Sequence, residues 1–239
     1  MELACEDRGQ GPAVLLVHGL ASDGRAWGAV ADRLAPRARV ISYDRRGYGD
    51  SGAPEPYERT TVYEQAEDAA AVIAALVAAP VLVCGEGFGA LIALDLLARH
   101  GGLVGAAVLA HPPLFAFVPE ATEALSAQRE QLSEAVREDG PQAAVERWLG
   151  GGVPEAALER ARGAHRAFFA DYAGLATWPV TREQLRGLPV PVAVLAGPHA
   201  PTHVRMAADR LAALLPRGEL RADDDVAAAA LALLDADKP

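Results

Sequence analysis

The sequence has few of the features that mark secreted or membrane-spanning proteins. It contains two cysteines, Cys5 and Cys84, too few for the disulfide framework of a small secreted protein. No apolar run approaches the roughly 20 residues that a membrane helix needs. The N-terminal residues MELACEDRGQ are acidic and polar, unlike a signal peptide. These absences predict a cytoplasmic protein that makes no contact with a membrane.

Positive charge is also scarce. The 22 basic residues are outnumbered by 32 acidic ones, which gives a net charge of −10, and Lys238 is the only lysine. Binding to nucleic acid relies on a basic surface that neutralises phosphates, so the charge balance predicts no nucleic-acid partner. The 51% of hydrophobic and 23% of charged residues are instead typical of a globular protein, and 239 residues suffice for one domain with a substantial core.

Short apolar runs alternate with longer helical patterns along most of the chain. The apolar runs occupy residues 13–17, 39–43, 80–84, 104–110 and 191–196, with a weaker one at 219–222. The helical patterns between and after them cover residues 27–34, 61–79, 88–100, 203–215 and 226–236. Such alternation is typical of βαβ units. It predicts an α/β fold with a mostly parallel sheet flanked by helices.

One long segment, residues 112–186, interrupts this alternation with mixed helical patterns and no clear strand. We expect it to form a helical cap inserted into a single domain, whose core comprises residues 1–111 and 187–239. Its aromatic side chains either form the cap's own core or line an apolar pocket between cap and sheet. They are Phe115, Phe117, Trp148, Phe168, Phe169, Tyr172 and Trp178.

Three short motifs follow the first three apolar runs in order. His18-Gly19 follows the first, DRRGYGDS (residues 44–51) follows the second, and GEGFG (residues 85–89) follows the third and opens a helical pattern. In this order they resemble the oxyanion loop, the D-x-R-G-x-G-x-S turn and the nucleophile elbow of the α/β-hydrolase fold superfamily. The resemblance covers nearly the whole chain, and it implies the α/β-hydrolase fold with a helical cap.

The same resemblance indicates what is missing. The elbow turn is so tight that Gly85 and Gly89 are steric necessities, but the central position, which normally carries the nucleophile, is Gly87. The acid of the family follows a late strand in a G-x-x-D pattern, where this chain has Ala200. Its histidine follows the last strand, where the loop from Asp223 to Val226 has none. The resemblance therefore implies a degenerate member that lacks the catalytic triad and is not a serine hydrolase.

Two main-chain hydrogen-bond donors do not depend on the triad residues, so we expect them to be present. The N–H groups of Leu20 and Phe88 occupy the positions that form the oxyanion hole in this fold. We expect a substrate pocket between them and the cap. Its predicted lining residues are Gly19, Gly87, His111, Phe115, Phe117, Trp148, Phe168, Phe169, Trp178 and His199.

The sequence offers four candidates for the base that would work with this oxyanion hole: His111, His199, His203 and the substrate itself. Glu86 is expected to point away from the pocket, and the aspartates 223–225 to form a solvated helix start. No histidine pair has the spacing of metal ligands, and no glycine-rich phosphate or dinucleotide motif occurs. We therefore expect neither a metal nor a cofactor.

A capped hydrolase fold with an oxyanion hole and no triad suits proton abstraction next to a carbonyl group. We therefore expect an isomerase, epimerase or cyclase that acts on a small molecule or a modified peptide in natural-product maturation. In size, composition and missing triad, the chain resembles the peptide aspartate epimerases of bottromycin biosynthesis. That resemblance implies an epimerase of peptidyl aspartate, assisted by the substrate's own carboxylate.

Three alternatives stay open. The first alternative is a cyclase or lyase of polyketide biosynthesis, and the second is a ligand-binding protein without catalytic activity. The third is a hydrolase with a displaced nucleophile, for which Ser22 and Ser51 are the candidates.

Overall fold

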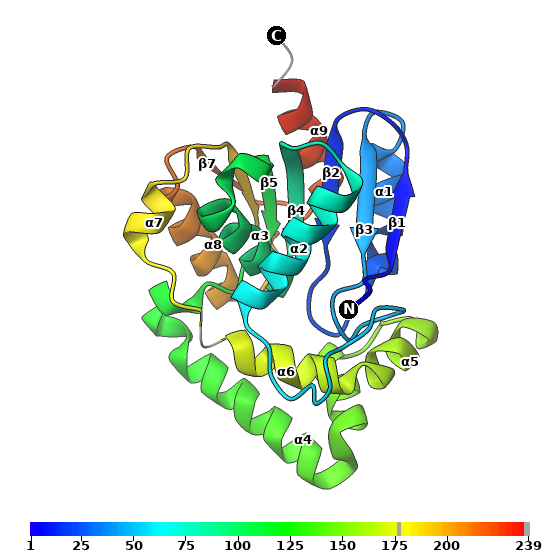
Figure 1. Cartoon of the computed structure of the whole chain (residues 1–239). Helices are drawn as coiled ribbons and strands as arrows, with labels where there is room; N and C mark the ends of the chain where they lie inside the picture. Colours follow the sequence, from blue (N-terminus) through cyan, green and yellow to red (C-terminus); the bar gives the residue numbers. More distant parts are fainter. Residues whose placement is uncertain (176–177, 237–239) are drawn as a thin grey trace.

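The computed structural model describes residues 1–175 and 178–236. Within them a seven-stranded sheet runs through the centre of the molecule, flanked by helices on both faces (Figure 1). The strands are β1 (Cys5–Arg8), β2 (Ala13–Val17), β3 (Arg39–Tyr43), β4 (Val81–Glu86), β5 (Val104–Ala110), β6 (Val192–Leu195) and β7 (Gly218–Arg221).

The strand order is β1-β3-β2-β4-β5-β6-β7. Every neighbouring pair is parallel except β1 with β3. Buried strands of this kind alternate their side chains between two helical layers. In β2, Leu15 and Val17 pack into one core and Val14 and Leu16 into the other.

The helices form those two layers. The first core contains residues of α2 (Val62–Leu76), α3 (Phe88–Arg99) and α8 (Thr202–Leu214), and the second contains residues of α1 (Gly28–Leu34) and α9 (Val226–Ala236). Short 3-10 helices lie at Gly24–Trp27, Gly101–Leu103, Phe115–Phe117 and Pro119–Ala121. In the described part of the chain, no helix combines the length and apolar character needed to cross a membrane.

The six predicted apolar runs coincide with β2 to β7, and the predicted α/β fold is confirmed. Strand β1 was not predicted. Its sequence, CEDR, has no apolar alternation, and three of its four residues are exposed. It forms because its main chain pairs antiparallel with β3, with Cys5 opposite Tyr43. Tertiary pairing, not local propensity, decides this strand.

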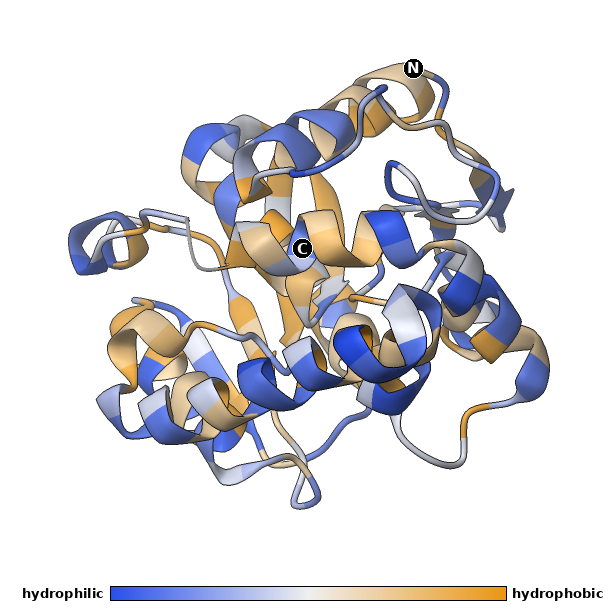
Figure 2. Ribbon diagram, turned by 90° about the horizontal axis from the view of Figure 1, so that it is seen from below, coloured by the Kyte–Doolittle hydropathy of each residue, from blue (hydrophilic) through white to orange (hydrophobic). Residues whose placement is uncertain are grey.

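Three helices make up the cap: α4 (Thr122–Leu149), α5 (Glu155–Gly163) and α6 (His165–Leu175). Helix α4 bends at Gly140, whose φ is 87°, directly before Pro141. In Figure 2 the hydrophobic colour concentrates on the central strands, whereas much of the cap ribbon is hydrophilic. The short helix α7 (Arg182–Arg186) lies within the predicted cap segment, but its Leu185 packs into the main core.

The cap has its own small core around Phe168. This ring is fully buried and meets Trp148, Phe169 and Tyr172 at centroid distances of 5.1 to 5.9 Å. Aromatic pairs at these distances stabilise a core beyond the area that they bury. Of the two interpretations of the cap aromatics, these contacts favour the first for Phe168 and Phe169.

A buried ion pair joins the cap to the sheet. Arg45, directly after β3, and Asp171, on α6, are both fully buried, with Nη1 of Arg45 2.7 Å from Oδ2 of Asp171. Tyr48 and Gln65 donate further hydrogen bonds to the same carboxylate. Each charge is thereby compensated and hydrogen-bonded, as buried charges require. Water cannot reach the Arg45 and Asp171 side chains while the cap is packed on the core, so this ion pair holds the cap in place.

Replacing Asp171 by alanine should lower the free energy of unfolding by about 3–5 kcal/mol, because it leaves the Arg45 guanidinium buried without its counter-charge. Denaturant unfolding of the purified variant measures this loss. The control is Glu138→Ala, which removes an exposed partner of Arg147 and should cost about 1 kcal/mol or less. Equal losses for the two variants would contradict the role given to the buried pair.

His18 makes the fold sensitive to mild acid. Burial, followed by the charge of Arg45, lowers the pKa of His18 well below its ordinary value of 6.5. The unfolded chain therefore takes up a proton below about pH 6.5 that the folded chain does not bind. The stability that the neutral His18 contributes should be fully present above that pH. The free energy of unfolding should fall by up to about 1.4 kcal/mol per pH unit below it. Denaturant unfolding between pH 7 and about 5.5 should show a shallower slope for His18→Asn than for the parent chain.

Candidate functional site

The elbow turn keeps the backbone of a nucleophile without its side chain. Gly87 links β4 to α3 with φ 54° and ψ −118°. A Cβ at Gly85 would lie 2.3 Å from the carbonyl oxygen of Gly89, and one at Gly89 would lie 2.1 Å from that of Val17. Both flanking glycines are therefore needed, as predicted. A Cβ at Gly87 meets only the Cα of Gly19, at 3.9 Å, so the central position has room for a side chain.

The two expected oxyanion donors are available. Within the described residues, the main-chain N–H groups of Leu20 and Phe88 have no intramolecular acceptor. The carbonyl of Gly19, in the same peptide unit as the Leu20 N–H, accepts a 2.8 Å hydrogen bond from Nη2 of Arg45. Since a trans peptide directs its C=O and N–H to opposite sides, this bond turns the Leu20 N–H away from Arg45. The buried guanidinium thus sets the orientation of one donor.

A histidine–aspartate pair lies at the same end of the sheet. His111, directly after β5, has its Nε2 2.8 Å from Oδ1 of Asp224, which precedes α9. The same oxygen accepts a hydrogen bond from the main-chain N–H of Gly197, at 2.6 Å. An ionised carboxylate only accepts hydrogen bonds, so the contact places the imidazole hydrogen on Nε2 and leaves a lone pair on Nδ1.

The structure pairs one of the candidate bases, His111, with an aspartate that was expected to belong to a solvated helix start. Asp224 lies in the loop where the family's histidine was expected, and the imidazole comes from the end of β5. Only part of the aspartate run is a helix start: Asp225 accepts from the N–H of Ala228 and pairs with Arg33. Sequence reasoning missed the contact because 113 residues separate His111 from Asp224.

Glu86 is the third titratable group at this end. It ends β4 and lines the cavity, which corrects the expectation that it points away. Glu86 itself is solvent-exposed. Packing of protein atoms around its carboxyl raises its pKa, while the neighbouring His111 lowers it and Asp224 raises it. No hydrogen bond or ion pair of the Glu86 carboxylate occurs among the described residues. Its unpaired state could not be read from the sequence, since it depends on what the cap places nearby.

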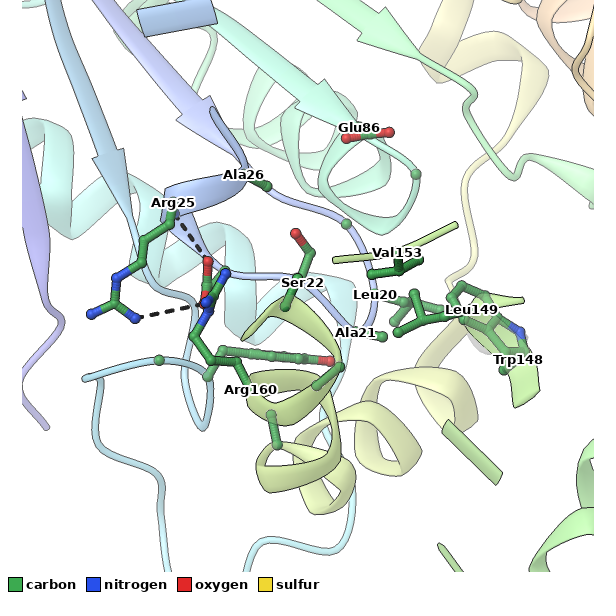
Figure 3. A pocket seen from close by; sticks show the side chains of 18 of the residues that line it. Leu20, Ala21, Ser22, Arg25, Ala26, Glu86, Trp148, Leu149, Val153 and Arg160 are labelled. Atoms are coloured by element: carbon green, nitrogen blue, oxygen red, sulfur yellow. Dashed lines mark hydrogen bonds and ion pairs between the residues drawn. The ribbon is translucent and has the colours of Figure 1, made fainter. Parts of the chain in front are cut away.

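Of these groups, Leu20, Glu86 and His111 line a cavity of about 440 Å³ between the carboxyl ends of the strands and the cap, within the range of small-molecule sites. Figure 3 shows Glu86 well separated from Arg25 and Arg160, with Trp148 and Leu149 on the cap side. The lining residues are Gly19, Leu20, Ala21, Ser22, Asp23, Arg25, Ala26, Tyr48, Gly49, Glu86, Gly87, His111, Trp148, Leu149, Val153, Ala157, Arg160, Ala161 and Ala164.

The structure places four of the ten predicted pocket residues in this lining: Gly19, Gly87, His111 and Trp148. The other six lie elsewhere, which corrects the prediction for them. Phe168 and Phe169 belong to the cap core, and Phe115 packs against His203, whose ring centroid is 5.3 Å away. Phe117 lies under the guanidinium of Arg182, Trp178 donates its Nε1–H to Asp95, and His199 is exposed.

The serine alternatives differ in position. Ser51 donates to the carbonyl of Asp44 and accepts from the N–H of Ala4, so it braces the turn after β3. Ser22 does line the cavity, but no histidine is bonded to its hydroxyl within the residues described. Neither serine therefore has the partner that activates a nucleophile.

Two residues at the cavity have a strained backbone. Ala21 and His111, with φ of 51° and 49°, are the non-glycine residues with positive φ in the described part of the chain, and both line the cavity. This conformation costs about 1–2 kcal/mol for an L-residue other than glycine. Strain of this kind gathers at functional sites, because a packed surrounding can hold a reactive side chain there.

The comparisons with known proteins agree with this geometry. Residues 12–151 match the family described as alpha/beta hydrolase fold. The chain belongs to that family.

Among its relatives is the uncharacterized hydrolase YraK of Bacillus subtilis, 40% identical over 93 residues, which are 39% of this chain and 34% of that protein. Matched segments span only 16% to 41% of the lengths of the curated relatives. Among solved structures, an alpha/beta hydrolase from Sphaerobacter thermophilus has a TM-score of 0.73 and 26% identity over 97% of this chain and 95% of that one. A thermophilic esterase from Thermogutta terrifontis has a TM-score of 0.74 and 25% identity over 91% and 83%.

The arrangement of the described side chains also bears on whether a metal ion could bind. Among the described residues, no group of three or more histidine, cysteine, aspartate or glutamate side chains is arranged to hold a metal ion. The chemistry available in the cavity is that of a base, a carboxyl group and main-chain donors.

The elbow predicts different outcomes for two neighbouring substitutions. Gly87→Ser should fold, with a loss of about 1–3 kcal/mol from the strained φ, because its Cβ has room. Gly85→Ser should cost more, because its Cβ would meet a main-chain oxygen. Soluble yield and denaturant unfolding of both variants measure the difference. An equally severe effect of Gly87→Ser would show that the elbow backbone differs from the one described.

Proposed function

We propose that this member of the family removes a proton next to a carbonyl group, without a covalent intermediate at position 87. The observation that carries the proposal is the hydrogen bond of Asp224 to His111, which lines a cavity next to free main-chain donors and a position 87 without a nucleophile. A base and an oxyanion hole are the two elements that enolate chemistry requires.

The steps follow from the positions of these groups. The substrate carbonyl accepts hydrogen bonds from the N–H groups of Leu20 and Phe88. Nδ1 of His111 takes the proton from the adjacent carbon, and the electron pair of the C–H bond becomes the enolate. Asp224 stabilises the imidazolium that forms. Return of the proton to the opposite face of the same carbon gives an epimer, and its return to another atom gives an isomer.

The finer substrate expected from the sequence, peptidyl aspartate, gains no support from the cavity. A second carboxylate would need a free cation, but Arg160 pairs with Asp23, and Arg25 pairs with Asp50 at 2.8 Å and lies 3.8 Å from Asp23. With His111 present, the proposed reaction also does not need the substrate's own carboxylate as a base.

Direct hydrolysis by water is the second candidate. The room at Gly87 favours it, because a water molecule there would occupy the place of a serine hydroxyl. His111 would then deprotonate this water, which attacks an activated ester directly. The names of relatives, hydrolase and esterase among them, point the same way.

Isotope incorporation separates these functions. The purified chain is incubated with carbonyl compounds extracted from its source organism, once in heavy water and once in ¹⁸O-labelled water, and products are identified by mass spectrometry. Proton abstraction predicts protein-dependent deuterium on carbon. Incorporation of ¹⁸O into a carboxylic acid without carbon-bound deuterium would favour hydrolysis by water, and a retained but unaltered ligand would favour a binding protein.

His111→Asn should lower the rate of deuterium incorporation by about 100-fold or more, the usual contribution of a general base. Asparagine tolerates the positive φ of this position, so the fold should survive. The matched control is His199→Asn, which changes an exposed histidine outside the cavity and should leave the rate unchanged. A His111→Asn variant that labels its substrate at the parent rate would rule out His111 as the base.

A further inference from the structure

The charges that line the cavity are unevenly compensated. At one side, the guanidinium groups of Arg25 and Arg160 face the carboxylate of Asp23, and Arg25 also pairs with Asp50. Both cations are therefore satisfied within the protein. Figure 3 shows this cluster on the side of the cavity away from Glu86.

The opposite side has more acid than base. The carboxyl of Glu86 lines the cavity without a partner among the described residues, and Asp224 is hydrogen-bonded to the imidazole of His111. His111 is thus bonded to Asp224 alone, Glu86 has no counter-charge, and no lysine or arginine lines this side. Such an imbalance of charge repels anions and attracts cations.

The cap supplies an apolar wall next to these acids. Leu149 and Val153 line the cavity beside Trp148, and Ala157 and Ala161 of α5 continue the same surface. A ligand that satisfies both regions has an apolar body and one positively charged group. An ammonium group meets the second requirement, since it donates hydrogen bonds to a carboxylate in any direction.

We propose that the cavity binds amines, with the ammonium group on the Glu86 carboxylate and the apolar body against the cap. The proposal deepens the proposed function and rests on it for one step. If the reacting carbonyl lies in the oxyanion hole, the substrate class is an α-amino carbonyl compound, such as an amino-acid amide or ester. The positive charge next to the α-carbon also favours removal of its proton. Glu86 is then the residue that determines specificity, and His111 is the base.

Binding of two amides that differ only in the amine tests this proposal. Leucinamide carries an ammonium group at about pH 6.5, whereas 4-methylpentanamide has the same carbon skeleton without it. Calorimetric or NMR titration of the purified chain should give an affinity about tenfold higher for leucinamide, as a charge-assisted hydrogen bond predicts. Glu86→Gln should reduce this preference to about onefold and leave the affinity for 4-methylpentanamide unchanged.

The control variant is Glu219→Gln, which removes the same charge from the exposed surface of β7. It should keep the tenfold preference, because its carboxylate lies outside the cavity. Equal binding of the two amides by the parent chain would overturn the proposal, and so would a preference that survives Glu86→Gln.

These outcomes are separate from those that test proton abstraction. A preference for leucinamide that depends on Glu86, without deuterium incorporation, would sustain the amine site and refute the proposed reaction. Deuterium incorporation into neutral carbonyl compounds, with no preference for amines, would sustain the reaction and refute the amine site.

Discussion

The guanidinium of Arg45 connects the three segments on which the candidate site is built. Its Nε donates to the carbonyl of His18 and its Nη2 to that of Gly19, so it fixes the loop after β2. Its Nη1 meets Asp171 on the cap helix α6. A fully buried arginine is tolerable only when its charge and donors are all matched. Loop, turn and cap must therefore assemble together, and the free N–H of Leu20 follows from that assembly.

Next to this fixed point, the turn between β4 and α3 places Gly87 in a positive-φ conformation at the edge of the cavity. The φ and ψ of Gly87 are those of a side chain aimed into the cavity, although glycine has no side chain to aim. The strained His111 after β5 is held by Asp224 from the opposite loop. A base can thus be supplied to the same cavity from strand ends other than those that usually provide it, because all carboxyl ends of a parallel sheet meet at one edge.

Electrostatics then decides which chemistry this arrangement suits. Asp23 neutralises the arginines at one side, so the cavity has no free cation with which to hold an anionic substrate. Glu86 remains without a counter-charge, and the packing around its carboxyl raises its pKa. Pairing with a ligand cation would restore its ionised form. The same side contains His111, so binding and proton transfer would occur at neighbouring groups.

The sequence by itself determined the fold and the elbow. Apolar runs such as AVLLV at β2 are typical of buried parallel strands, and Gly85 and Gly89 are required by close main-chain contacts at the turn. Such features depend on neighbours in the chain and on a regular period. It also showed that position 87 has no nucleophile, since that follows from residue identity alone.

Only the tertiary structure decided which side chains share the cavity. The pairing of His111 with Asp224 joins loops far apart in the chain, and the strand CEDR pairs through its main chain alone. The cap aromatics show the same limit: helical periodicity predicted an apolar face but not its partner, and Phe168 packs within the cap while Trp148 reaches the cavity. Such contacts depend on how helices are oriented across the fold, which is set by packing and not by local sequence.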